Sequence, residues 1–388
     1  MSTVFSPRRW LGILALAAAC AGSAPALIHA QANPTPKGAT VKPNVAADLK
    51  ITPLRLQKLP ARTFVPAQGK ATMDGWTALT DTATLGGASL YSFEGHAGIV
   101  TTGGDGGLYI ASFNPAAPAA VTAWSFQPGG LVSEPHCKPF KRQQDQAGQY
   151  RIACVGLTAA GAAKAVELRD TGGFGYDFAL DLGGKSGPDA PNFVGDPHEQ
   201  YLGYAGYGQL HFEFDTGVTV NGALWVSRYR DDIGAGAWST VAGAFRATPV
   251  TSSENLFTPT AKGTAIQVLP VVPTPVIPVG SNLPPPYTLK AAVATSPLAG
   301  VALSGEMAAV TVQSNLVVVV ARGEDAQLYQ IAFDTKNNAF IGSWKADGGV
   351  VPAHTWPSCV AANQKPVCVI QGADGKLYAK TLQAGGAL

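Results

Sequence analysis

Charged residues are scarce in this 388-residue chain. They make up 13% of it, against about 25% in an average soluble domain. Arg8 and Arg9 are the only charged residues among the first 32, so two of the 27 Lys and Arg fall there and 25 remain, against 25 Asp and Glu. A neutral chain lacks the basic surface that binds phosphate backbones, so no nucleic acid is expected as a partner.

Long apolar runs are also absent after the N-terminus. None reaches the ~20 residues that span a bilayer, so the sequence predicts no transmembrane segment. Hydrophobic residues still make up 46% of the chain, which is enough for a sizeable core and excludes wholesale disorder.

Familiar catalytic and metal-binding patterns are missing as well. There is no Gly-x-Ser-x-Gly nucleophile turn, no complete phosphate-binding loop, no calcium loop and no paired-cysteine zinc motif. The six His are scattered, with no pair four residues apart. The sequence therefore predicts no metal, no cofactor and no catalytic residue. A glycosidase remains an alternative, with Glu94, Glu134 and Glu213 as the candidate carboxylates. A sequence does not show whether two of them lie about 5–10 Å apart, as glycoside hydrolysis requires.

The N-terminus has the pattern of an export signal. Arg8 and Arg9 precede an apolar stretch over residues 10–21, and small-residue cleavage sites follow at residues 24–26 and 30–32. We favour the second site, which predicts a signal peptide over residues 1–32 and a periplasmic or extracellular protein. Cys20 follows three Ala and resembles a lipoprotein box, so a lipid anchor at Cys20 is the alternative.

Proline marks two further segments. Residues 33–70 contain six Pro and read as a linker or lead-in to a domain over residues 71–388. Inside that domain, seven of residues 270–286 are Pro, which predicts a polyproline-like loop over residues 269–287. A stiff spacer is the favoured interpretation, and a partner-docking segment is the alternative.

A repeated turn motif organises the rest of the chain. Residues 103–109, 322–329 and 371–378 all contain Gly-x-Asp-x-x-Leu-Tyr. Each follows a β-branched run and precedes an alternating segment, which predicts a β-hairpin with Gly and Asp in the turn. A second element, an aromatic strand followed by a Gly-Gly turn, recurs at residues 124–130 and 344–349, with degenerate copies at 178–184 and 238–244.

The spacing of the turns gives the number of units. Leu328 and Leu377 are 49 residues apart, and Leu108 and Leu210 are 102 apart. The 118 residues from Leu210 to Leu328 become 101 without the proline-rich stretch. A period near 50 predicts an all-β propeller of six four-stranded blades, with five or seven as alternatives. The missing turns fall near residues 155–168 and 264–272. The strand at Trp76 precedes every hairpin and closes the ring with the last copy.

Four cysteines occupy equivalent places in two repeats. Their positions on neighbouring strands of an exported chain predict the disulfides Cys137–Cys154 and Cys359–Cys368.

The turn motif, together with the aromatic strand, resembles the tectonin-repeat lectins and the related bacterial fucose-binding β-propeller lectins. That resemblance implies sugar binding in shallow pockets between blades, where an aromatic ring stacks on the sugar. The sequence departs from the family before the turn glycine, because Arg occurs there only as Arg322. Fewer sites than blades are therefore expected.

The aromatic residues separate into two groups. Trp124, Trp238 and Trp344 recur with the period, which favours packing between blades. Trp356 breaks the period and lies with His354 in a loop, while Glu134 and His136 lie at the corresponding turn of an earlier unit. We predict the ligand-binding residues Trp356, His354, Glu134, His136 and Arg322. The alternative for Trp356 is that it covers the neighbouring disulfide.

The sequence thus predicts an exported, non-catalytic binding module, with glycans as the expected partner. The alternatives are a structural or protein-binding propeller of the cell envelope, with an envelope protein as partner, and a propeller glycosidase.

Overall fold

The computed structural model describes much of the second of two units, Met1–Leu49 and Lys50–Leu388. It describes residues 72–383 except residues 94–95, 119–120, 123, 141–149, 160–161, 171–173, 184–197, 206–210, 221, 231–233, 236–237, 242–244, 274–286 and 354. The predicted signal peptide, the linker and Cys20 lie outside these residues. The described part contains β-strands and no helix, and therefore no helix able to cross a membrane.

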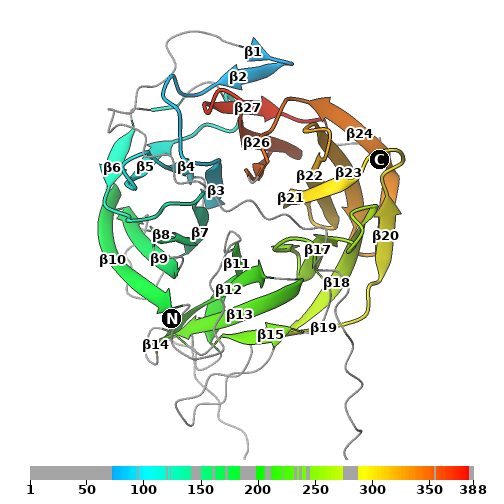
Figure 1. Cartoon of the computed structure of the whole chain (residues 1–388), viewed down its shortest axis with the longest axis horizontal. Helices are drawn as coiled ribbons and strands as arrows, with labels where there is room; N and C mark the ends of the chain where they lie inside the picture. Colours follow the sequence, from blue (N-terminus) through cyan, green and yellow to red (C-terminus); the bar gives the residue numbers. More distant parts are fainter. Residues whose placement is uncertain are drawn as a thin grey trace, which may run out of the picture. The chain divides into compact units, whose positions relative to one another are not determined.

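The strands form six antiparallel sheets, which Figure 1 shows arranged as a ring. The first sheet has the order β3 (Ala88–Phe93), β4 (His96–Thr102), β5 (Leu108–Ser112), β6 (Ser125–Gln127). The second has β7 (His136–Phe140), β8 (Tyr150–Leu157), β9 (Ala163–Asp170), β10 (Phe174–Gly183). The third has β11 (His198–Ala205), β12 (His211–Val220), β13 (Ala223–Arg230), with β14 (Gly234–Ala235) and β15 (Ser239–Val241) both paired to β13.

The other three sheets continue the same plan. The fourth has β16 (Val250–Ser252), β17 (Asn255–Pro259), β18 (Ala265–Pro273), with β19 (Tyr287–Leu289) and β20 (Ala294–Pro297) both paired to β18. The fifth has β21 (Leu303–Gln313), β22 (Leu316–Gly323), β23 (Leu328–Asp334), β24 (Ala339–Gly348). The sixth has β25 (Ser358–Ala362), β26 (Lys365–Gln371), β27 (Leu377–Thr381), β2 (Trp76–Ala78), β1 (Thr72–Met73). Three sheets therefore have a fifth strand, where four were predicted.

Contacts between the first strands of successive sheets close the ring. β3 contacts β7, β7 contacts β11, β11 contacts β16, β16 contacts β21, β21 contacts β25, and β25 contacts β3. The fold is therefore a β-propeller, and the described residues form six sheets, the number of blades that the repeat spacing predicts.

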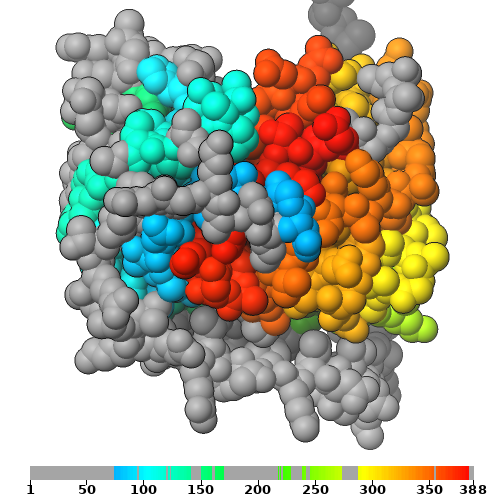
Figure 2. Space-filling view, turned by 90° about the horizontal axis from the view of Figure 1, so that it is seen from above, coloured from blue at the N-terminus to red at the C-terminus, as the bar shows by residue number. Residues whose placement is uncertain are grey.

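Both ends of the described chain share the sixth blade, as predicted. Strand β2 pairs with β27 through Thr77 opposite Ala379 and Ala78 opposite Tyr378. Figure 2 shows the blue N-terminal segment lying beside the red C-terminal one. Because the last blade takes its outer strands from the N-terminal side, the sheet does not end in an unpaired edge at β27.

Both faces of a blade are buried, which explains the continuous β-branched runs. In β22, Val318 and Val320 pack with Trp76 of the sixth blade, while Val317 and Val319 pack with Phe257 of the fourth. Alternate side chains therefore face the two neighbouring blades. Trp124, Trp238 and Trp344 are half-buried against three such clusters, so their predicted packing role is confirmed.

Both predicted disulfides are present, between the first and second strands of two blades. Cys137 of β7 lies directly opposite Cys154 of β8, and Cys359 of β25 lies opposite Cys368 of β26.

One turn was assigned wrongly from the sequence. Residues 206–210 lie outside the described part, but the strands on either side are β11 and β12, the first and second of their blade. The second and third strands of that blade meet instead around Gly222, whose φ of 79° suits a tight turn. Of the other two predicted turns, the one near residues 155–168 is correct, because β8 joins β9 between Leu157 and Ala163. The one near residues 264–272 is placed too late, because β17 joins β18 between Pro259 and Ala265.

The proline-rich segment also begins later than predicted. Residues 269–273 are not a loop but the end of β18, where Pro270 lies opposite Asn255 and Val271 lies opposite Leu289. Val271 and Val272 favour strand, and Pro is tolerated in a strand where its missing N–H is not needed. Residues 274–286 lie outside the described part.

Candidate functional site

Glu134 connects three consecutive blades. Its Oε2 accepts hydrogen bonds from the backbone N–H of Gly87 at 2.8 Å and of Trp356 at 3.0 Å. Gly87 directly precedes β3, Glu134 lies just before β7, and Trp356 lies just before β25. The carboxylate is buried and lies where the first, second and sixth blades begin. These two hydrogen bonds connect the segments that precede the first strands of the three blades.

Trp356 is part of the same buried arrangement. Only 5% of it is exposed, it packs in the core between the fourth and fifth blades, and its ring lies edge-on to His136 at 5.9 Å between centroids. The structure thus brings Trp356, Glu134 and His136 together as the sequence suggests. The open stacking surface that a ligand role needs is not present, because protein covers the Trp356 ring. His354 lies outside the described residues.

His136 lines a small central cavity. Burial lowers its pKa to about 3, so the imidazole is neutral at physiological pH. The cavity has a volume of about 120 Å³ and is lined by residues of β3, β7, β16, β21 and β25 and by Pro357. Ligand pockets usually measure about 300–1,000 Å³. No Asp or Glu is among the described residues that line it, so the paired carboxylates of a glycosidase are not found there.

Arg322 has a structural partner. Its Nε donates to the carbonyl oxygen of Val351 at 2.7 Å, and its Nη1 lies 4.0 Å from Oε2 of Glu306. The two equivalent positions behave alike. Thr102 donates to the carbonyl of Ser133, and Gln371 to that of Thr84. In all three blades, the residue before the turn glycine donates a hydrogen bond to the backbone segment that leads into the next blade. This contact between neighbouring blades explains why Arg322 is buried.

The Asp and Tyr of the repeated turn bind each other. The Tyr109 hydroxyl donates to Asp105, Tyr329 to Asp325 and Tyr378 to Asp374, over 2.6–2.8 Å. The other carboxylate oxygen accepts the backbone N–H two residues on, from Gly107, Gln327 and Lys376. Burial and the adjacent carboxylate raise the pKa of Tyr109 and Tyr378 to about 12. For Tyr329, the hydrogen bond to Asp325 is the larger cause of the same rise in pKa. These contacts confirm the turn role predicted for Asp.

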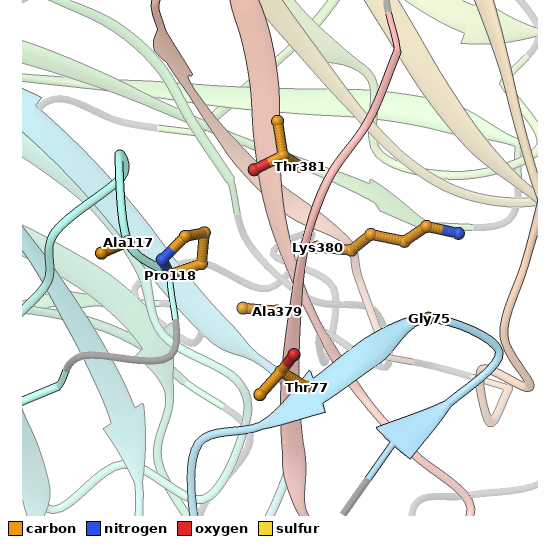
Figure 3. A pocket seen from close by; sticks show the side chains of 7 residues that line it. All are labelled: Gly75, Thr77, Ala117, Pro118, Ala379, Lys380 and Thr381. Atoms are coloured by element: carbon orange, nitrogen blue, oxygen red, sulfur yellow. The ribbon is translucent and has the colours of Figure 1, made fainter. Parts of the chain in front are cut away.

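A larger pocket lies between the last and the first blade. We call it the seam groove; its volume is about 440 Å³ and it is lined by Gly75, Thr77, Ala117, Pro118, Ala379, Lys380 and Thr381. Figure 3 shows the β5–β6 connection, with Ala117 and Pro118, across the groove from β27, and the Pro118 ring lies on the side of β27.

Two threonines provide the polar side chains of the seam groove. Thr77 lies opposite Ala379, and Thr381 lies two residues further along the same face of the sheet. Both are partly exposed, and neither hydroxyl bonds to another described residue. Lys380 points the other way, since its Nζ donates to the carbonyl oxygens of Asp347 at 2.6 Å and Asp74 at 3.2 Å. The groove therefore offers free hydroxyls beside an apolar wall formed by Ala117, Pro118 and Ala379.

Sequence reasoning missed this groove. Its residues come from three segments up to 306 positions apart, and none belongs to the repeated motif. The predicted pairing of the strand at Trp76 with the last hairpin is the one signal that places Thr77 beside Ala379.

Three comparisons bear on the fold. No protein-family model matches the chain, and no curated protein matches it. Among solved structures, the chain is similar to a mutant of AofleA from Arthrobotrys oligospora, with 9% identity over 78% of this chain and 85% of that one and a TM-score of 0.50. It is also similar to the six-bladed Aleuria aurantia lectin, with 15% identity over 77% and 92% and a TM-score of 0.44. The periplasmic gluconolactonase of Pseudomonas aeruginosa matches with 14% identity over 82% and 94% and a TM-score of 0.41. At such low identity, a likeness to a solved structure concerns the fold alone and assigns no function to this chain.

Proposed function

We propose that this chain is an exported, non-catalytic carbohydrate-binding propeller that takes a glycan in the seam groove. The contrast between the two cavities described above supports the proposal most. The central cavity is smaller than a typical ligand pocket, whereas the seam groove falls within the typical range and is open at the surface between two blades.

The chemistry of the seam groove suits a sugar. The Thr77 and Thr381 hydroxyls each offer a donor and an acceptor for sugar hydroxyls. Ala117, Pro118 and Ala379 offer apolar surface for the C–H face of a sugar ring. The Nζ of Lys380 donates to the carbonyls of Asp74 and Asp347, and no other lining residue is a base that could activate a threonine hydroxyl. Binding without turnover is therefore the role that these residues support.

The test uses the oxidised chain over residues 33–388 on a glycan array that includes methyl α-L-fucoside, the ligand named for the Aleuria aurantia lectin. Thr77→Val with Thr381→Val removes both hydroxyls while preserving side-chain shape. Ala117→Arg fills the groove from the exposed β5–β6 connection. Thr295→Val, on an exposed site of β20, is the matched control.

We expect the double threonine variant to bind the best glycan about tenfold more weakly, because each lost hydrogen bond contributes about 0.5–1.5 kcal/mol. Ala117→Arg should abolish binding at this site, and Thr295→Val should leave it unchanged. Full binding by all the groove variants would refute the location. Binding of an envelope protein but of no glycan would favour the structural alternative.

A further inference from the structure

We propose that Phe126 is the centre of a second sugar-binding site, on the first blade and separate from the seam groove. This inference rests on the proposed carbohydrate-binding function. Phe126 lies in β6, and 55% of it is exposed. The other exposed large apolar side chains of the described residues are Val272, Val293 and Val350, so Phe126 is the one aromatic among them.

The ring of Phe126 is held firmly from below. Its centroid lies 5.5 Å from that of Tyr109, edge to face, and Tyr109 is fixed by its hydrogen bond to Asp105. A Cβ at position 107 would lie 2.2 Å from Cε2 of Phe126, so the ring sits directly on the backbone of Gly107. A ring supported in this way keeps one orientation while the rest of its surface faces solvent.

Among the three blades that carry the complete turn motif, this arrangement occurs only in the first. Tyr109 lies opposite Phe126, whereas the equivalent Tyr329 and Tyr378 lie opposite Ala346 and Ala78. The position of Gly107 is taken by Gln327 and Lys376 in the other two turns. A side chain there would collide with the Phe126 ring, so the glycine and the phenylalanine are matched to each other.

Stability does not explain an exposed phenylalanine at this position. The other two blades build the same turn with alanine, and burial of a Phe side chain is worth about 1.5–3 kcal/mol that partial exposure forgoes. A ring that is positioned and exposed is suited to contact something outside the chain.

The size of the exposed surface favours a sugar over a protein. A Phe side chain covers about 150–250 Å², so 55% exposure leaves only about 100 Å². A stable protein interface needs about 800 Å² per partner, and the three exposed valines belong to the fourth blade or to the connection after the fifth.

The polar surroundings point the same way. Asp105 is exposed, and it is linked to the ring through Tyr109, which donates to the Asp105 carboxylate and packs edge to face with Phe126. The face of an aromatic ring carries partial negative charge, which attracts the C–H groups of a sugar ring. A carboxylate such as that of Asp105 accepts hydrogen bonds from sugar hydroxyls.

The two sites lie toward opposite ends of the strands. Phe126 is next to the repeated turn, because Gln127 pairs with Leu108 at the start of β5. Thr381 is four residues from Leu377, which starts β27 after the equivalent turn. At about 3.3 Å per residue, that is about 13 Å along the strand. One chain therefore has room for two sugars at once.

The test titrates the best-binding array glycan into the oxidised chain by calorimetry, with wild type, Phe126→Ala, Phe126→Tyr and the control Val350→Ala. We expect wild type to bind two sugars per chain. Phe126→Ala should lose one of them, or bind it about tenfold more weakly. Phe126→Tyr should restore it, and Val350→Ala should match wild type. Equal melting temperatures would show that the variants are folded.

Each outcome separates this inference from the proposed function. Glycan binding by Phe126→Ala with unchanged stoichiometry and affinity would overturn the second site and leave the seam groove standing. Loss of one site in Phe126→Ala, with a separate loss in the double threonine variant, would support both. A folded wild type that binds no array glycan would overturn the proposed function and this inference together.

Discussion

Replacement of Glu134 by alanine should destabilise the propeller more than any exposed charge does. Two buried backbone N–H groups, of Gly87 and Trp356, both bond to its Oε2. A buried donor left without its acceptor costs about 1–3 kcal/mol, so losing both should cost about 2–6 kcal/mol of unfolding free energy. Glu134→Gln should cost about 1–2 kcal/mol, because one amide oxygen can serve both donors but without the strength that charge adds.

A double-mutant cycle makes this prediction sharper. A Cβ on Gly87 would lie 2.5 Å from Oε2 of Glu134, and its three nearest atoms all belong to the Glu134 carboxyl group. Gly87→Ala alone should therefore destabilise the wild type, but should cost much less when Glu134 is already Ala. That coupling tests whether the two residues are in contact.

Urea denaturation of the oxidised chain, followed by tryptophan fluorescence, measures these free energies. Glu324→Ala is the control, since Glu324 is 54% exposed in its ion pair with Arg246 and should cost no more than about 1 kcal/mol. A loss below about 1 kcal/mol for Glu134→Ala, or additive effects of Gly87→Ala and Glu134→Ala, would refute the reasoning.

Two further predictions concern pH and redox state. Burial lowers the pKa of His136 from 6.5 to about 3, so only the unfolded chain takes up this proton between those values. The free energy of unfolding is therefore highest above pH 6.5 and falls by about 1.4 kcal/mol for each pH unit between pH 6.5 and 3. His136→Phe should remove this loss when urea midpoints at pH 7 and pH 5 are compared. The same loss in wild type and variant would contradict the prediction. Each disulfide should contribute about 2–3 kcal/mol, because Cys137–Cys154 and Cys359–Cys368 close loops with separations of 17 and 9. Cys137→Ala with Cys154→Ala, unfolded in urea beside wild type, checks this, and an unchanged midpoint would contradict it.

Local chemistry made much of the fold predictable. Gly, Asp and Tyr recur at fixed spacing because each turn uses the same contacts, as at Gly323, Asp325 and Tyr329. The disulfides followed because both pairs join the first and second strands of a blade. The predicted number of six blades agrees with the six sheets although the turn at Leu210 was assigned wrongly. That error exchanged two turns of one blade and therefore left the number of blades unchanged.

The candidate site was less predictable, for physical reasons. The loop around Trp356 has the prolines of an exposed connection, but neighbouring blades cover it, and a local pattern carries no information about that cover. Thr77, Pro118 and Thr381 are small residues without a motif, and the closed ring brings them together. Phe126 was visible only as part of an aromatic strand, and its exposure depends on Gly107 of the facing turn.

Glycan-array binding by the oxidised wild-type chain over residues 33–388 tests the central claim most directly. The account predicts selective, saturable binding to a subset of glycans that free glycan competes away and that Ala117→Arg reduces. A folded, oxidised chain that binds no glycan above the background of the array would contradict it.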